Sequence, residues 1–250
     1  MAHFEKGINT TMITLQKQSD KYRIYINEQY YGEVECHHNT LHMGNCYVKV
    51  NMPFLDVSIS KELFAKLKAS EGCPLQAMVD SGDVAMVEFL NAGGFLCKRK
   101  CYEMDATAED YIGSSGDIQL CACTYGDLEY EECCRMMYRY YSETHKTVNP
   151  LTSDLPAFCT ELPEKVAYAI QDNQIVSLAF VESNEIAYVC GVDKVHFVRF
   201  ACSLVSSMLA EHDTVFFEAD DCDWAAMALR ALFKNLDDVR YDTYILGDEL

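Results

Sequence analysis

The sequence predicts an α+β (α/β) fold of two domains, each a mixed, mostly antiparallel sheet flanked by helices. Short runs of β-branched and aromatic residues alternate with segments whose apolar residues recur at helical spacing. An acidic stretch with Gly, Ser and Ala but no apolar period, residues 105–117, divides the chain. The order of strands and helices is similar on its two sides, so we expect residues 1–108 and 117–250 to form two related domains.

Before the central stretch, three short strands are followed by two helices with another strand between them. Residues 57–69 place apolar side chains such as Leu63 and Leu67 on one helical face. The second helix ends at Gly93 or Gly94, because glycine commonly follows a helix C-terminus. The predicted order is strands 23–28, 30–38 and 45–50, helix 57–69, strand 74–81, helix 83–95 and strand 97–104.

After the central stretch the same order recurs, with two additional helices behind its first strand. Three strands follow these helices, and polar turns at residues 172–173 and 183–184 separate them. The predicted order is strand 117–124, helices 128–145 and 152–163, strands 166–171, 175–183 and 185–191, a helix ending at His212, strand 214–220, helix 223–235 and strand 241–246.

Composition excludes several classes of function. The formal net charge is −19, with 39 acidic and 20 basic residues, so broad nucleic-acid binding is not expected. An acidic surface of this kind is typical of proteins that it keeps in solution, and it also fits a cationic partner or amine substrate. Thirteen cysteines without a spaced framework predict reduced thiols. We found no signal-peptide pattern and no run of about 18 apolar residues, so we expect a cytoplasmic protein that does not contact membranes.

A strand, a loop and a long helix over residues 185–212 carry a family resemblance. The order of elements over residues 117–250 resembles the GNAT N-acetyltransferase superfamily, and residues 1–108 resemble the same fold without its first strand and helices. The chain therefore looks like a tandem, partly degenerate GNAT protein. The resemblance implies that the strand before the long helix diverges from its neighbour, and that acyl-CoA lies in the gap. Its pantetheine arm would bind the main chain of Val189, Cys190 and Gly191.

The family also has a pyrophosphate motif, Q/R-x-x-G-x-G/A, in which small residues let phosphate reach main-chain N–H groups. Aligned on the long helix, His196, Arg199 and Ala201 occupy the three marked positions. Arg199 replaces the first glycine, so it either blocks the phosphate or pairs with it. In the first half, Ser58 and Ser60 occupy the glycine positions, and that loop is sterically more permissive.

Amine acetylation needs a proton acceptor for the amine and a proton donor for the leaving thiolate. The resemblance assigns the acceptor to Glu185, eleven residues before His196, with Glu218 as a second candidate. The tyrosine that many family members carry in the last helix is missing from both halves. Tyr188 is therefore the candidate donor, and Tyr244 is an alternative.

The tract at residues 36–46 offers Cys36, His37, His38, His42 and Cys46 to a metal ion. Zinc takes four such ligands in a tetrahedron. Neighbouring histidines on a strand point to opposite faces, so His37 and His38 cannot easily bind one ion together. We therefore expect no metal.

These observations predict an N-acetyltransferase that moves an acetyl group from acetyl-CoA to a primary amine. The acceptor would be a small molecule or a peptide. A competing hypothesis is a non-catalytic GNAT-like protein that binds a ligand or partner between its lobes, and a third places the active site in the first half. The oligomeric state is left open, because the strand at 241–246 could pair two subunits or the two halves.

Overall fold

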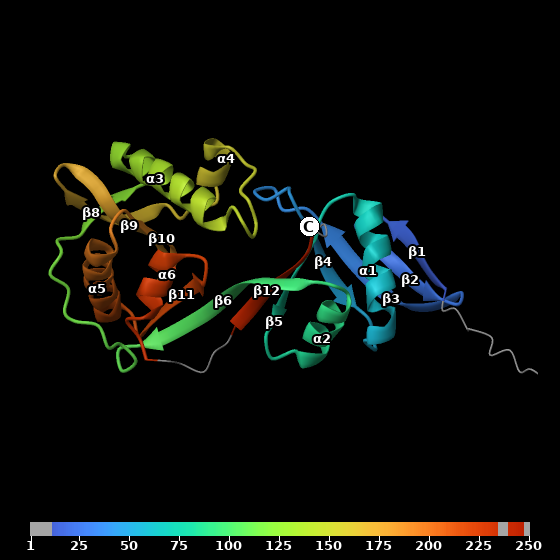
Figure 1. Ribbon diagram of the computed structural model, residues 1–250. Coiled ribbons are helices and arrows are strands. Elements are labelled where there is room, and N and C mark those ends of the chain that lie inside the picture. Colours follow the sequence, from blue (N-terminus) through green and yellow to red (C-terminus); the bar gives the residue numbers. More distant parts are fainter. Residues whose placement is uncertain (1–11, 235–239, 248–250) are drawn as a thin grey trace, which may run out of the picture.

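The computed structural model describes residues 12–234 and 240–247, which form one 12-stranded sheet with helices on both faces (Figure 1). The predicted α+β class is confirmed. The strands lie in the order β1-β2-β3-β4-β5-β12-β6-β11-β10-β9-β8-β7. We call β1–β5, β12, α1 and α2 the first lobe, and β6–β11 with α3–α6 the second lobe.

The chain before the central stretch follows the predicted order, with one strand added at its start. The additional strand, β1, is an edge strand in which only Ile13 is fully buried, so its polar sequence has no clear period. The elements are β1 (Ile13–Gln18), β2 (Lys21–Ile26), β3 (Gln29–His37), β4 (Cys46–Asn51), α1 (Val57–Glu71), β5 (Leu75–Asp80), α2 (Val84–Ala92) and β6 (Leu96–Thr107).

The second half also follows the predicted order, but its first strand and two of its helices are shorter than predicted. The strand predicted at 117–124 is reduced to β7, which begins at Cys121. The helix predicted at 152–163 is reduced to α4, and the one predicted at 223–235 is reduced to α6, whose last predicted residue lies outside the described residues. The elements are β7 (Cys121–Thr124), α3 (Leu128–His145), α4 (Leu155–Cys159), β8 (Lys165–Gln171), β9 (Gln174–Glu182), β10 (Glu185–Gly191), α5 (Lys194–Glu211), β11 (Thr214–Asp220), α6 (Trp224–Arg230) and β12 (Arg240–Leu246).

The two halves of the chain exchange their last strands. Strand β6 comes from the first half but pairs with β11, and β12 comes from the second half but pairs with β5. The two exchanged strands also pair with each other, at the middle of the molecule (Figure 1). Of the two partners left open for the strand at 241–246, the structure shows pairing within the chain. The division into residues 1–108 and 117–250 stays a prediction, and a cut there separates strands of one sheet.

Helices cover the two lobes differently. In the second lobe, α5 and α6 pack on one face through residues such as Phe200 and Leu229, while α3 and α4 pack on the other through Met137 and Phe158. In the first lobe, α1 and α2 pack on one face. The loop between β3 and β4 crosses to the second lobe beside α4 (Figure 1), where Leu41 O accepts a hydrogen bond from the Thr152 N–H at 2.8 Å.

Each lobe contains one pair of parallel strands that diverges almost at once. Strands β10 and β11 pair only at Glu185 and Phe216, and β4 and β5 pair only at Cys46–Leu75 and Tyr47–Gln76. A bulge between Ile186 and Tyr188 interrupts the pairing of β10 with β9. Because a bulge bends its strand and increases its twist, it directs β10 away from β11.

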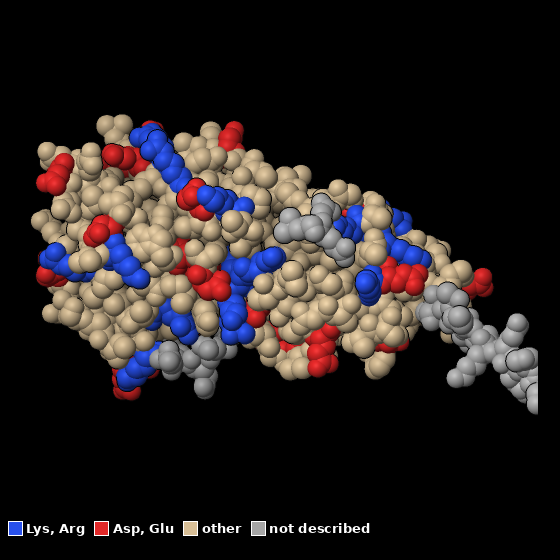
Figure 2. All heavy atoms as spheres, in the orientation of Figure 1, with Lys and Arg blue, Asp and Glu red and all other residues tan. Residues whose placement is uncertain are grey.

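The surface is charged but not segregated on the face drawn in Figure 2, where basic and acidic side chains are interspersed. All thirteen cysteines are free thiols. Among the described residues, no helix combines the length and hydropathy that a membrane crossing requires.

Candidate functional site

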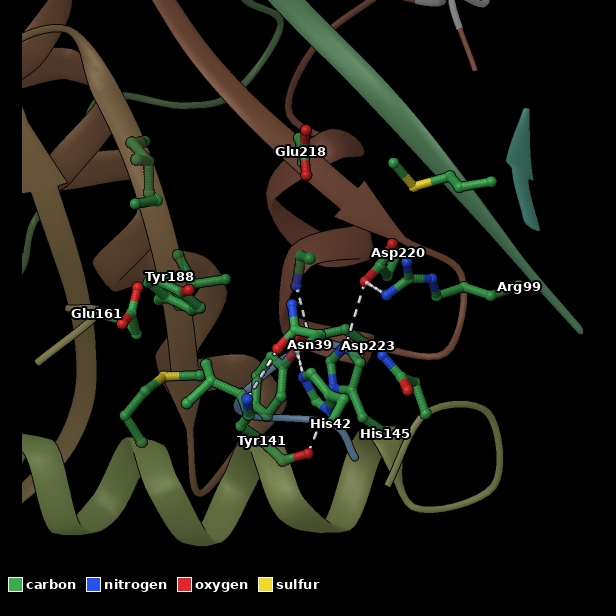
Figure 3. Close-up of a pocket in the computed structure, with 18 of the residues that line it drawn as sticks. Asn39, His42, Arg99, Tyr141, His145, Glu161, Tyr188, Glu218, Asp220 and Asp223 are labelled. Carbon is green, nitrogen blue, oxygen red and sulfur yellow. Dashed lines mark hydrogen bonds and ion pairs between the residues drawn. The ribbon is translucent and has the colours of Figure 1, made fainter. Parts of the chain in front are cut away.

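A cavity of about 520 Å³ lies between the two lobes, where β10 and β11 diverge. We call it the interlobe cavity. Strands β10, β11 and β6 and helices α3 and α6 supply its second-lobe wall, and β5 and the β3–β4 loop supply its first-lobe wall. Figure 3 shows Tyr188 and Glu161 on one side of the cavity and Arg99 and Asp220 on the other. The site therefore depends on both lobes.

The cavity wall is strongly acidic. Five carboxylates line it, whereas Arg99 is the single arginine or lysine among the described lining residues. The same wall includes two histidines, His42 and His145. A wall of this composition favours a positively charged ligand. The carboxylates are Glu161, Glu185, Glu218, Asp220 and Asp223.

Asp220, at the end of β11, is held by two partners. Arg99 Nη1 donates to Asp220 Oδ2 at 2.9 Å, and His145 Nε2 donates to the same oxygen at 3.1 Å. Burial raises the pKa of Asp220, but the hydrogen bond from His145 and the charge of Arg99 lower it by more, so the net pKa is below the ordinary value. Asp220 is therefore ionised at neutral pH, and its Oδ1 atom is buried without a partner among the described residues.

The end of α3 connects this carboxylate to the first lobe. The Tyr141 and His145 rings stack with centroids 4.0 Å apart. The His42 ring lies beside them (Figure 3), with Nδ1 3.2 Å from Pro150 O and Nε2 3.2 Å from Tyr141 Oη. A carbonyl can only accept, so His42 Nδ1 carries the proton and Nε2 accepts from Tyr141. Burial lowers the pKa of His42, which keeps the ring neutral.

Glu218 lies two residues before Asp220 and has the opposite shift. Its carboxyl group opens into the cavity, where Cys101 Sγ donates to Oε2 at 3.7 Å. Desolvation by the surrounding protein raises its pKa, and the charge of Asp220 raises it further. Two nearby carboxylates with pKa values shifted apart are an arrangement typical of acid–base sites.

Known structures identify the architecture. No protein-family model matches the sequence, and no curated protein sequence matches it. The GCN5-related N-acetyltransferase from Sphaerobacter thermophilus is similar over 91% of this chain and 80% of its own, with a TM-score of 0.54 and 10% identity. The chain has the GNAT fold.

Two further structures with this fold have lower TM-scores. A GCN5-related N-acetyltransferase from Kribbella flavida has a TM-score of 0.49 and 12% identity, over 94% of this chain and 89% of its own. A tandem GNAT protein from the clavulanic acid biosynthesis pathway has a TM-score of 0.48 and 12% identity, over 94% and 83%. The structure from Sphaerobacter thermophilus alone, with its TM-score of 0.54, confirms the predicted GNAT resemblance at the level of the fold.

Within the GNAT fold, the predicted residues of β10 lie along the diverging strand. Glu185 stands at the point where β10 meets β11, and Glu185, Tyr188 and Val189 line the cavity. Burial raises the pKa of Tyr188, and the charges of nearby glutamates raise it further, so its hydroxyl stays protonated. Cys190 and Gly191 continue the strand and are buried.

The three residues aligned with the pyrophosphate motif point to different surroundings. Ala201 is only 1% exposed and lies in the core, and Arg199 pairs with Asp117 at 2.6 and 3.0 Å on the surface. His196 Nδ1 lies 3.0 Å from Ser177 Oγ. Helix α5 already begins at Lys194, so Arg199 and Ala201 are helical residues beyond its first turn.

The N-terminus of α5 carries a carboxylate of its own. Asp193 caps the helix and accepts from the His196 N–H at 2.8 Å. In the first lobe, Asp56 caps α1 and accepts from the Ser58 N–H at 2.9 Å. A carboxylate at this position occupies a donor and repels phosphate, so neither helix start fits the pyrophosphate well. Ser60 is buried and donates to Phe89 O, away from the loop.

A second hollow, of about 490 Å³, offers positive charge beside the same loop. Gly191 and Val192 line it from the end of β10, and Arg135 and Arg139 line it from α3. Guanidinium groups are good hydrogen-bond donors to phosphate. The residues around this hollow fit the phosphates of an acyl-CoA better than the α5 N-terminus does.

Sequence reasoning did not place four residues in the interlobe cavity, although it considered one of them, His42, as a metal ligand: Arg99, Asp220, His42 and His145. The basic run at 98–100 and the aspartates after β11 were visible in the sequence. Their pairing depends on the strand exchange, which places β6 beside β11. No local pattern carries that information.

Proposed function

We propose that the chain is an acyl-CoA-dependent N-acetyltransferase that transfers an acetyl group from acetyl-CoA to a primary amine held in the interlobe cavity. One observation carries the proposal: β10 and β11 diverge after a single residue pair, into a cavity lined by carboxylates. Beyond Glu185, the described residues of β10 have strand pairing with β9 alone. The main chain of Val189, Cys190 and Gly191 is therefore our candidate for holding the pantetheine arm.

Unpartnered polar atoms support an amine as the acceptor. Asn149 is 5% exposed and donates to Tyr47 Oη at 2.6 Å, but its Oδ1 atom is buried without a partner among the described residues, as is Asp220 Oδ1. Both oxygens can accept from an ammonium or amine group. The Arg99 Nε–H group is also buried without a partner among the described residues. The amine that fits this cavity best therefore also carries an oxygen atom to which Arg99 can donate a hydrogen bond.

We assign the proton acceptor to Glu218 and the proton donor to Tyr188. Glu218 has a raised pKa, which makes it a better base near neutral pH than an ordinary glutamate. It takes the amine proton while the nitrogen lone pair attacks the thioester carbonyl. The carbon–sulfur bond then breaks, and the leaving thiolate takes the Tyr188 proton. Glu185, at the start of β10, is the competing proton acceptor.

For the phosphates, we propose Arg135 and Arg139, which flank Gly191 and Val192. His196 lies on the first turn of α5 and is a further candidate contact. Arg199 would have to leave Asp117 to take part, and Ala201 is buried in the core.

A second function, amine binding without transfer, has one observation in its favour. Both helices that would face the pyrophosphate begin with an aspartate whose carboxylate already accepts from the first turn. A protein that no longer binds acetyl-CoA could retain the acidic cavity and bind a cationic ligand between its lobes.

The test is a transfer assay with acetyl-CoA and a panel of small amines, with and without hydroxyl or carbonyl groups. The acetylated amine should be followed by mass spectrometry, because the chain's own free thiols would react with a thiol reagent. We expect product formation that is lost in E218Q and reduced in the double variant Arg135→Ala/Arg139→Ala. Lys61→Ala, an exposed change on α1, is the control.

Thermal-shift measurements separate the two functions. Stabilisation by both acetyl-CoA and an amine agrees with the transferase. Stabilisation by an amine alone, without product, contradicts it and supports the binding protein.

A further inference from the structure

A cluster of metal-ligand side chains lies in the first lobe, outside the interlobe cavity. The ligand atoms of His38, Cys46 and Glu71 all lie within 4.8 Å of one another. Cys36 lies two residues before His38 along β3 and is buried in the same core as Cys46. A thiol, an imidazole and a carboxylate are therefore grouped at one place with a second thiol nearby on the same strand, and these are the ligand types that Zn²⁺ prefers.

The sheet register explains the grouping. Cys36 pairs with Val48 and His37 with Tyr47, so the next residue, His38, comes opposite Cys46. Side chains alternate along a strand, so Cys36 and His38 share the face that α1 covers, and His37 points to the other face. Helix α1 ends at Glu71 above this face. Because His37 and His38 point in opposite directions, only His38 is available to the ion. Helix α1 supplies a further ligand, Glu71, which lies outside the 36–46 tract.

Neighbouring side chains already hold the carboxylate. Lys17 Nζ donates to Glu71 Oε1 at 2.7 Å, and the Tyr22 hydroxyl donates to the same oxygen. The Glu71 side chain is only 9% exposed. Groups that hydrogen-bond a ligating carboxylate in this way orient it toward a metal, and the Lys17 charge offsets the excess negative charge of two thiolates and a carboxylate around a dication.

Burial and access also suit a structural metal. Cys46 is fully buried and Cys36 is 7% exposed, so both thiols are protected from solvent. His38 is exposed and gives an ion a route to the cluster. The other cluster with metal-ligand types, His145, Asp220 and Cys222, differs because the Arg99 guanidinium lies on Asp220 and opposes a cation.

We propose that this chain binds one Zn²⁺ through His38, Cys46 and Glu71, with Cys36 as the fourth ligand. On binding, the two thiols lose their protons and the ion bridges β3, β4 and the end of α1. The evidence for this site does not rest on the proposed acetyl transfer.

The position of the site gives it a structural role. His38 and Cys46 stand at the two ends of the β3–β4 loop, and that loop supplies Asn39, Leu41 and His42 to the interlobe cavity. A metal at the base of the loop holds both of its ends. Zinc binding therefore keeps the first-lobe wall of the cavity in place.

The experiment measures zinc in the full chain, purified with a non-chelating reductant, and then titrates the metal-stripped protein with Zn²⁺ and Co²⁺. We expect one ion per chain and a Co²⁺ spectrum with thiolate charge-transfer absorption and tetrahedral coordination. His38→Ala and Glu71→Gln should weaken binding by more than tenfold without unfolding the protein, because both side chains lie at the edge of the cluster. Lys17→Met should weaken it by about 10- to 100-fold.

Cys222→Ser is the matched control, because it removes a thiol from the other cluster, and it should bind zinc as the wild type does. The proposal is overturned if the wild type takes up no zinc or if His38→Ala and Glu71→Gln bind it unchanged. Loss of binding in Cys222→Ser alone would also overturn it, by moving the ion to the interlobe cavity.

Discussion

The diverging strands of the two lobes open into different surroundings. In the second lobe, β10 and β11 diverge beside the end of α3, and the gap is a cavity lined by carboxylates. In the first lobe, β4 and β5 diverge into a hollow of about 430 Å³ that no helix other than α2 lines among the described residues. The same strand arrangement therefore has a wall of carboxylates and a contact with α3 only in the second lobe, among the described residues.

Matched positions on β5 and β11 show the same contrast. Both strands end in aspartate, and a second aspartate three residues later caps the next helix. Asp220 is mostly buried against Arg99 and His145, whereas Asp80 is exposed and accepts from the Gly82 N–H at 2.8 Å. Two residues earlier, the second lobe has Glu218 and the first lobe has Met78. Of these matched positions, only those of the second lobe combine a glutamate with an aspartate held by Arg99 and His145.

The largest effect that we predict concerns the independence of the lobes. Residues 1–108 and 117–250, produced separately, should each fail to unfold cooperatively, because β6 and β12 lose their partners. Mixing the two fragments should restore a cooperative transition, measured by circular dichroism during denaturation. A cooperative transition in the second fragment alone would contradict this and would make the lobes independent.

Asp220→Ala should destabilise the fold by about 3–5 kcal/mol, because it leaves the Arg99 charge buried without its partner. Asp80→Ala should cost less than about 1 kcal/mol, because Asp80 is exposed and has only a turn hydrogen bond. Urea denaturation of both variants makes the comparison. Equal losses would show that the two strand ends are equivalent.

The contribution of Asp220 to folding stability depends on pH with a definite sign. The folded-state pKa of Asp220 is lowered, so its stabilising contribution is fully present above the unfolded value of about 3.9. The contribution disappears as the pH falls through the lower folded value. The stability difference between wild type and Asp220→Ala should therefore persist at neutral pH and narrow only in strong acid.

Glu218→Gln should lower acetyl transfer by at least about 10²-fold if Glu218 is the proton acceptor. Its raised pKa places the loss of activity on acidification at a higher pH than for an ordinary glutamate, and the variant should lack that acidic limb in a pH–rate profile. Glu88→Gln, an exposed change on α2 in the first lobe, is the control. If the acidic limb of the pH–rate profile is unchanged in Glu218→Gln but lost in Glu185→Gln, Glu185 is the proton acceptor instead.

The smallest effect compares the helix caps of the two lobes. Asp193→Ser keeps a capping side chain on α5 but removes the negative charge beside Gly191. Acetyl-CoA should bind up to about fivefold more tightly, as expected for a charge at a helix N-terminus. Asp56→Ser on α1 should leave the affinity for acetyl-CoA, measured by calorimetry, unchanged. A gain in Asp56→Ser instead would place the donor in the first lobe.

Local periodicity predicted much of the fold because the relevant signals are local. The bounds predicted for 128–145, 185–191 and 214–220 match α3, β10 and β11. The strand exchange was not predictable, because β6 and β11 pair across more than a hundred residues. The divergence beside Tyr188 was expected from the family resemblance, but the Arg99–Asp220 contact follows from the exchange. The motif alignment gave no start for α5, and the Asp193 cap determines it.

The exchanged strands also constrain how a ligand reaches the interlobe cavity. Domains joined by a linker can rotate apart about a hinge, but here the lobes are joined through the ladders of β6 and β12. Rotation would break backbone hydrogen bonds in the middle of the sheet. The β3–β4 loop adds a second connection, because it hydrogen-bonds to the segment after α3. A ligand therefore has to enter between lobes that both the strand ladders and this loop hold together.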